Sequence, residues 1–378
     1  MAILAAGTAP GAEPGSLESV LHPFFERGAV AGAVALVANG DQTLHIAAFG
    51  SAEIGRSQPM RTDALFWIAS ETKPVTAAAV MMLVEEGRVS LDAPVAEYLP
   101  EFDGQMVVLE KTADRITLER PRRGFTLREA LSHMTGLPFK SSVESPTLDA
   151  LPLATAVRSY AALPLEWQPG TRYQYSNAGI NTAARVLEVV SGMAYETFLE
   201  ERIFKPLGMQ DTTFWPSAEQ LQRLATSYKP DETKTKLVET TVGQLTYPLD
   251  DRMRRFPMPA GGLFSTAGDM ARFGQMLLRG GELNGRRVLS EASVAEMCRR
   301  QTPKSVKERY GLGLAVGDDF FGHGGAYATN LEILPSRNLV LVWMVQHAGF
   351  PLDGKDAQAV FKQWARTMPA AAGQAAPR

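Results

Sequence analysis

The stretch that organises this chain is FWIASETKPVTAAAVMML, residues 66–83. Its run of alanine, valine, methionine and leucine predicts a helix over residues 71–86. Pro74 falls in the first turn, where a missing N–H costs little, and Gly87 is suited to end the helix. Ser70 is therefore expected at a helix N-terminus, where unpaired N–H groups and the helix dipole favour developing negative charge.

Ser70 and Lys73 form an S-x-x-K pair, with the spacing that brings two side chains together on one helix face. A serine hydroxyl is a weak nucleophile alone, and an amine held beside it can take or relay its proton. This is the chemistry of an S-x-x-K serine hydrolase. A chance S-x-x-K is expected about once in a chain of this length, so the motif needs support from the rest of the sequence.

The composition is that of a globular enzyme with a sizeable core, with 45% hydrophobic and 21% charged residues among 378. A net charge of -3 gives no electrostatic case for nucleic acid or an anionic membrane surface as partner. The single cysteine, Cys298, excludes an internal disulfide and a cysteine-ligated metal site. The five histidines lack metal-ligand spacing, so we expect neither a metal nor a cofactor.

No apolar run reaches membrane-spanning length, and we expect no membrane span. The first residues, MAILAA, lack the basic region and long apolar core of a secretion signal. We expect a cytoplasmic protein, or a periplasmic or secreted one whose signal was removed before this numbering begins. Residues 1–15 and 369–378 are rich in alanine, glycine and proline and are expected to be flexible ends. The oligomeric state is left open.

Strand-like segments occur near both ends of the chain. Residues 30–37 and 43–49 are apolar runs joined through Asn39 and Gly40, a strong hairpin signal. Further strand-like segments are residues 310–316, 328–334 and 339–346. With helical patterns at both ends, these segments favour an α+β fold in which one antiparallel, five-stranded-type sheet is flanked by helices.

The middle of the chain is mostly helical. Helical patterns occur at residues 126–134, 151–163, 179–191, 195–203 and 217–228, separated by loops rich in glycine and proline. We therefore expect a discontinuous α/β lobe, residues 16–100 and 255–368. A mostly helical lobe, residues 101–254, would be inserted into it.

Two further motifs accompany the S-x-x-K pair. The turn-rich segment PGTRYQYSN, residues 169–177, carries Tyr175 and Asn177, and the segment FGHGGAYAT, residues 321–329, carries His323-Gly324-Gly325. The three motifs have the order and approximate spacing of penicillin-recognising serine enzymes. From about residue 16 to 368 the chain resembles the serine β-lactamase-like, penicillin-binding-protein-like superfamily. It is most similar to the class C β-lactamase and family VIII carboxylesterase branch. The resemblance implies a β-lactamase/transpeptidase-like fold.

The resemblance also implies a catalytic role for each matching residue. Ser70 would be the acylated nucleophile, and Lys73 would share its proton with Tyr175, the general base of this branch. Because a free tyrosine has a pKa of about 10, an adjacent cationic Lys73 would have to stabilise the phenolate. Asn177 would hydrogen-bond Lys73 or the substrate.

The remaining matches concern the bound carbonyl group of the substrate. The backbone N–H groups of Ser70 and Ala326 would form the oxyanion hole. Gly324 and Gly325 would let the strand backbone approach the substrate closely.

One position departs from the β-lactamase pattern. The third motif of β-lactamases begins with lysine, a permanent cation that engages the carboxylate of the antibiotic, whereas this chain has His323. A histidine is largely neutral at pH 7 unless its pKa is raised. The resemblance therefore implies a carboxylesterase on short-chain esters. A D-stereospecific peptidase or amidase, or a weak β-lactamase on the same scaffold, stays open because H-x-G variants occur among D-amino-acid peptidases.

Other readings compete with this one. The chain has no G-x-S-x-G elbow, which argues against an α/β-hydrolase. A non-catalytic binding protein that kept the fold is disfavoured by the intact Ser70, Lys73 and Tyr175. The substrate is expected to be a small ester or amide, and the aromatic residues expected to wall the pocket are Phe139, Trp215, Phe256 and Tyr327.

Overall fold

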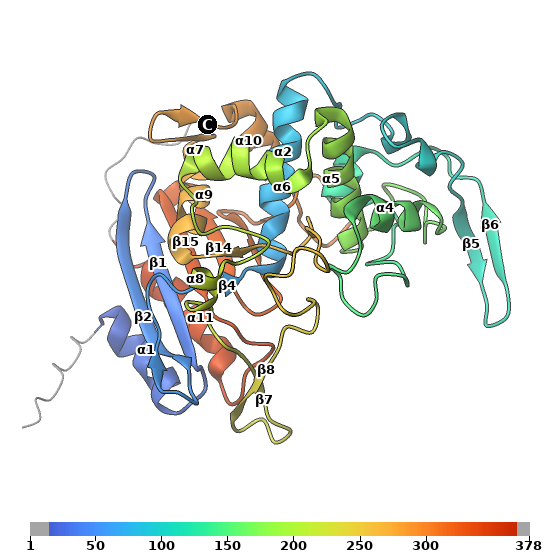
Figure 1. Ribbon diagram of the computed structural model, residues 1–378. Helices are drawn as coiled ribbons and strands as arrows, with labels where there is room; N and C mark the ends of the chain where they lie inside the picture. Colours follow the sequence, from blue (N-terminus) through green and yellow to red (C-terminus); the bar gives the residue numbers. More distant parts are fainter. Residues whose placement is uncertain (1–14, 369–378) are drawn as a thin grey trace, which may run out of the picture.

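The computed structural model describes residues 15–368 and is built around a seven-stranded antiparallel sheet (Figure 1). The strand order is β12-β13-β14-β15-β1-β2-β3, so the first and last parts of the chain share one sheet. The strands are β1 (Gly32–Ala38), β2 (Thr43–Glu53), β3 (Gln58–Pro59), β12 (Ala315–Val316), β13 (Phe321–Gly324), β14 (Asn330–Leu334) and β15 (Leu339–Met344).

Helices cover both faces of this sheet because its central strands β1 and β15 are buried on both sides. Ala35 and Val37 pack with Trp343 against the terminal helices α1 (Leu17–Glu26) and α11 (Ala357–Ala365). The alternate residues, Val34, Leu36, Val340 and Val342, pack on the opposite face in the main core, with α2 (Thr72–Glu85) and α9 (Ala267–Leu278). The period-two alternation of a strand thus separates two apolar clusters.

In the helical middle of the chain, α4 and α5 lie on the side of α2 that faces away from the terminal helices (Figure 1). The helices of this middle part are α3 (Leu127–Leu131), α4 (Leu153–Ala161), α5 (Asn177–Ser191), α6 (Tyr195–Leu199), α7 (Lys205–Leu207) and α8 (Ala218–Leu221). Helix α10 (Glu291–Cys298) packs against α2. Helices α2 and α5 also contact one another, which brings the S-x-x-K pair next to the segment that precedes α5.

Four two-stranded sheets complete the described residues. They are β4 (Phe66–Trp67) with β9 (Phe264–Ser265), β5 (Val107–Lys111) with β6 (Ile116–Glu119), β7 (Ser227–Pro230) with β8 (Leu237–Thr240), and β10 (Glu282–Leu283) with β11 (Arg286–Arg287).

The α+β fold with an antiparallel sheet flanked by helices is confirmed, but the sheet has seven strands where five were expected. The strand expected at residues 310–316 was wrong in extent, since only β12 pairs. Gly313 there has φ +73°, which breaks extended backbone, and Leu312 and Leu314 pack into the core. The expectation also missed β3 and β13, and β13 includes the first two residues of the H-G-G motif.

Two other expectations differ from the structure. The helix expected at residues 217–228 is only α8, after which the chain turns into β7. The expected flexible ends fall, apart from Gly15, outside the described residues. Within residues 15–368 no helix has the length and apolarity required to cross a membrane.

Candidate active site

Ser70 lies in a short 3₁₀ turn, Ala69–Glu71, between β4 and α2. Ala69 has φ +46°, a left-handed conformation that is strained for a residue with a side chain. The turn is held from outside: Ile68 N donates to Leu263 O at 3.0 Å, and Trp67 N donates to the side chain of Gln346 at 3.0 Å. The segments around Ser70 therefore impose a conformation that the local sequence would not prefer.

Lys73 is the second residue of α2, and its side chain is fully buried next to Ser70. Its Nζ is 3.1 Å from Ser70 Oγ, 3.0 Å from Asn177 Oδ1 and 2.6 Å from the carbonyl oxygen of Ala260. Burial lowers the pKa of Lys73 well below its usual value, with no carboxylate partner to oppose the shift. Burial therefore favours the neutral amine over the ammonium form.

A neutral amine has two N–H donors and one lone pair. The carbonyl oxygens of Asn177 and Ala260 only accept, so they take both N–H groups of Lys73. The third contact is a hydrogen bond from Lys73 Nζ to Ser70 Oγ at 3.1 Å, and when the amine is neutral its lone pair takes this place and can accept from the Ser70 hydroxyl. This arrangement suits the removal of a proton from Ser70.

Tyr175 is held by the segment before α5. The neighbouring Gln174 N donates to His133 O at 3.0 Å, and Ser176 N donates to His133 Nδ1 at 3.2 Å. Ser176 caps α5, since its hydroxyl accepts from Gly179 N at 3.2 Å. Asn177 is the first helical residue, and its side chain accepts a hydrogen bond from Lys73, one of the two partners expected for it.

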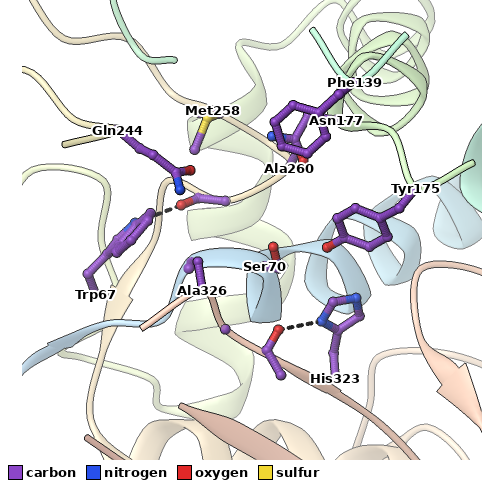
Figure 2. Close-up of a pocket in the computed structure, with 14 residues that line it drawn as sticks. Trp67, Ser70, Phe139, Tyr175, Asn177, Gln244, Met258, Ala260, His323 and Ala326 are labelled. Carbon is purple, nitrogen blue, oxygen red and sulfur yellow. Dashed lines mark hydrogen bonds between the residues drawn. The ribbon is translucent and has the colours of Figure 1, made fainter. Parts of the chain in front are cut away.

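The phenol of Tyr175 points toward Ser70 in the pocket (Figure 2). Its ring centroid is 4.6 Å from Lys73 Nζ. Burial raises the pKa of Tyr175 above its usual range, an effect that the nearby Ser70 hydroxyl only partly offsets. Both shifts oppose the expected pair of phenolate and ammonium, and they favour a neutral phenol beside a neutral amine.

His323 stands at the end of β13 with both ring nitrogens engaged. Nδ1 is 2.7 Å from Gly324 O, which only accepts, so Nδ1 carries the proton. Nε2 is 2.9 Å from the hydroxyl of the buried Tyr310, and as the unprotonated nitrogen it accepts from that hydroxyl. Burial, with a smaller effect of Lys73, lowers the pKa of His323 to about 3. His323 is thus a neutral residue whose tautomer is set by its neighbours.

A cavity of about 370 Å³ opens above Ser70 and brings the motifs together (Figure 2). Its lining includes Ser70, Tyr175, Asn177, His323, Gly324, Gly325 and Ala326, while Lys73 lies behind Ser70 and outside the lining. Gly325 is required sterically, because a Cβ there would lie 2.6 Å from Ile68 O. Glycine at this position lets the end of β13 approach the turn that carries Ser70.

The rest of the cavity lining was mostly not anticipated from the sequence. Of the four aromatic residues expected as walls, only Phe139 lines the cavity. Trp67 lies there instead, and Tyr327 packs edge-on behind Trp67 at 5.2 Å between ring centroids. The other new members are Ala69, Gln244, Met258, Ala260 and Gly261. Among these residues, only Gly261 belongs to a recognisable sequence pattern, the segment GGLFSTAGD at residues 261–269.

Metal ligation has no visible basis in the described part of the chain. No group of three or more histidine, cysteine, aspartate or glutamate side chains between residues 15 and 368 is arranged to hold a metal ion. Cys298, the single thiol, lies on α10 away from the cavity lining.

Most of the chain is similar to known proteins. A family model described as Beta-lactamase matches residues 17–363. Protein Rv1367c of Mycobacterium tuberculosis is 34% identical over 366 residues, which cover 87% of this chain and 89% of that protein. Penicillin-binding protein 4 of Amycolatopsis lactamdurans is 30% identical over 321 residues, 82% of this chain and 78% of that protein. The solved structure of a family VIII carboxylesterase has the same fold, with TM-score 0.73 and 21% identity over 93% of this chain and 96% of that one.

Proposed function

Since the chain belongs to the Beta-lactamase family, we propose that it is a carboxylesterase that forms an acyl-enzyme at Ser70. Its substrates would be short-chain esters that carry no negative charge near the scissile bond. Water would then release the acyl group, and the reaction as proposed uses no cofactor.

The observation that carries this choice is the charge of the cavity. Of the side chains that line it within the described residues, none is aspartate, glutamate, lysine or arginine. His323 takes the position of the lysine that engages the antibiotic's carboxylate in β-lactamases, and Tyr310 and Gly324 hold it neutral. A substrate carboxylate would lose its hydration without gaining a cation, which costs several kcal/mol. A neutral ester meets no such penalty.

In the first step, Lys73 would act as the general base. Ser70 Oγ attacks the ester carbonyl carbon while its proton passes to the lone pair of Lys73 Nζ, 3.1 Å away. The carbonyl oxygens of Asn177 and Ala260 stabilise the ammonium that forms. The N–H groups of Ser70 and Ala326 would bind the developing oxyanion.

Tyr175 would complete the proton path. As a neutral phenol pointing at Ser70, it can give a proton to the departing alkoxide and recover one from Lys73. In the second step a water would attack the acyl-enzyme with the same groups in reverse order, which regenerates Ser70. Both steps use only side chains already gathered around Lys73.

The direct test is a comparison of initial rates on p-nitrophenyl butyrate and on nitrocefin, a β-lactam with a carboxylate. Ester turnover is expected in the wild type and in Ser305→Ala, an exposed serine, and no turnover in Ser70→Ala. Nitrocefin is expected to be hydrolysed slowly, and His323→Lys should raise the nitrocefin-to-butyrate ratio. Fast nitrocefin turnover by the wild type would refute the charge argument, and ester turnover in Ser70→Ala would refute the nucleophile.

Acyl-chain length provides a second readout. Trp67, Phe139 and Met258 are the bulky apolar side chains of a cavity of only about 370 Å³, which leaves little room for a long acyl chain. Butyryl esters are therefore expected to react faster than decanoyl esters. A higher kcat/KM for p-nitrophenyl decanoate would contradict this expectation.

A peptidase on D-amino acids is the second candidate, and similarity to penicillin-binding protein 4 is what favours it. Its substrate would present a free carboxylate or a neutral amide near the cavity. Turnover of a D-alanyl p-nitroanilide with little ester hydrolysis would select it. A lack of both activities, with no labelling of Ser70 by a fluorophosphonate, would leave a binding protein.

A further inference from the structure

The hairpin β5–β6 projects from the helical part of the molecule, and β6 is its outer strand (Figure 1). Strand β5 is covered at its base, where Val108 N donates to Leu165 O. The other strand carries two exposed apolar side chains, Ile116 at 52% and Leu118 at 42% exposure. An uncovered edge strand with apolar side chains is a template for pairing with another chain.

The hydrogen-bond pattern of the hairpin fixes which groups of β6 face outward. Thr112 N donates to Arg115 O, so Arg115 faces β5 and the next residue, Ile116, faces away from it. Alternation along β6 then turns Thr117 inward and Leu118 outward. The direction of Val108 N, away from its partner Leu118 and toward Leu165, agrees with this assignment. The N–H and C=O groups of Ile116 and Leu118 therefore form a free hydrogen-bonding edge.

The segment D-R-I-T-L-E-R, residues 114–120, is complementary to itself when a second copy pairs antiparallel about Thr117. Ile116 then faces Leu118 of the second copy, and both have outward backbone groups, so each such pair exchanges two hydrogen bonds. The flanking charges match as well. Asp114, in the turn that precedes β6, comes close to Arg120 of the second copy. Arg115, which also contacts Glu110 of its own hairpin, faces the second copy's Glu119.

Neighbouring registers lose this match. If the two copies paired about Ile116, Asp114 would lie opposite Leu118 of the second copy, and Arg120 would lie beyond the paired segment. A centre at Leu118 sets Ile116 against Arg120. Only pairing about Thr117 joins the two apolar residues and gives each of the four charges an opposite partner.

We propose that β6 is a homodimer interface, in which two β5–β6 hairpins join into a four-stranded antiparallel sheet across a twofold axis at Thr117. Residues 107–119 do not line the cavity, so both active sites stay open in the dimer. Because a single strand on each side buries little area, the dimer is expected to be weak, with a dissociation constant on the order of micromolar.

Sedimentation velocity over a range of about 1–200 μM tests the proposal through charge reversal. Asp114→Arg and Arg120→Asp each set like charges against one another twice and should sediment as monomers. Mixed together, the two variants should restore a heterodimer, because every reversed charge then meets its opposite. The double variant should dimerise like the wild type.

Fold and activity serve as the control. Both positions are exposed on the hairpin, so melting temperature and ester turnover should be unchanged in the single variants. A wild type that stays monomeric at the highest concentration would overturn the proposal. So would a dimer that persists in both single variants, or a mixture that fails to associate.

Discussion

Lys73 is the most constrained side chain around the cavity. It is fully buried, has no carboxylate partner and contacts three oxygen atoms from three separate segments. Burial lowers the pKa of such a lysine, which favours the neutral amine and its lone pair more than at an exposed lysine. We therefore expect that this position requires an amine that can lose its proton and that a permanent positive charge would not suffice.

Replacing Lys73 by arginine tests this requirement. A guanidinium cannot be deprotonated in a protein, so Lys73→Arg is expected to lose as much activity as Lys73→Ala, roughly 10³-fold or more in kcat. The measurement is kcat for p-nitrophenyl butyrate together with a melting curve for each variant. Lys205→Arg, at an exposed lysine, is the matched control and should be unaffected. Substantial activity in Lys73→Arg would show that charge alone suffices.

Glu71, next to the nucleophile, has a buried carboxyl group that makes stability depend on pH. Its carboxyl is fully buried, and neither oxygen has a partner in hydrogen-bonding geometry among the described residues. Burial raises the pKa of Glu71 from 4.5 to about 8, although Thr329 and Lys362 offset part of the shift. The native protein thus keeps this proton between pH 5 and 8, while the unfolded chain releases it. The contribution of Glu71 to stability is lost as pH rises through this window.

Glu71→Gln is therefore expected to remove a pH dependence. Relative to the variant, the free energy of unfolding of the wild type should fall by a few kcal/mol between pH 5 and pH 8. Urea denaturation at unit pH steps measures the difference, with Glu101→Gln as an exposed control. Parallel stability curves for wild type and Glu71→Gln would mean that Glu71 titrates normally.

At the level of elements, helix α2 is positioned by close backbone contacts. The segment before β12 lies directly on it: Gly313 N donates to Leu131 O, and a Cβ on Gly313 would meet Ala77 Cβ at 2.6 Å and Lys73 O at 2.7 Å. Gly313 also has φ +73°. A glycine here lets α2 approach the sheet and α3 at once, which sets the depth at which Lys73 lies.

Gly313→Ala should therefore destabilise the fold by about 2–4 kcal/mol, through strain at positive φ and displacement of α2. Gly285→Ala is the matched control, since Gly285 has φ +76° but open space around it, and it should cost only about 1 kcal/mol. Chemical denaturation gives both values. Equal costs at the two positions would show that backbone strain, and not contact with α2, explains the glycine.

At the level of the whole molecule, a buried ion pair crosses the boundary that we propose between the two lobes. Arg255 Nε donates to Asp149 Oδ2 at 2.7 Å, and the two side chains are 2% and 1% exposed. Arg255 also donates to Phe214 O at 2.9 Å, and Asp149 accepts from Thr246 N at 2.9 Å. The pair thus ties together the loops that lead to Met258 and Gln244 in the cavity wall.

Removing one partner should be costly, because it leaves the other charge buried alone. Arg255→Met is expected to destabilise the protein by about 3–5 kcal/mol and to lower kcat/KM, whereas Arg309→Met, which breaks an exposed pair with Asp318, should cost under about 1 kcal/mol. Adding Asp149→Leu to Arg255→Met should recover part of the loss. A double variant whose loss equals the sum of the single losses would argue against coupling.

The amino-acid sequence by itself determined the family, the α+β class and the residues of the three motifs that meet at the cavity. Those features depend on local patterns: period-two apolar strands, helix stops, and three short motifs whose order is preserved along the chain. Strand number was less accessible, because β3 has only two residues and β13 contains two glycines and a histidine, so each forms a strand only where β2 or β14 offers a partner. The helix expected at residues 217–228 is shorter than the sequence pattern indicates for the same reason, because distant contacts draw the chain after α8 into β7.

Only the tertiary structure decided the charge state of the site. The sequence suggested a cationic Lys73 beside a Tyr175 phenolate, whereas burial moves both pKa values toward the neutral forms. His323 is likewise neutral because Tyr310 and Gly324 surround it. Desolvation and hydrogen bonding depend on groups brought together from remote parts of the chain, and no local pattern records them.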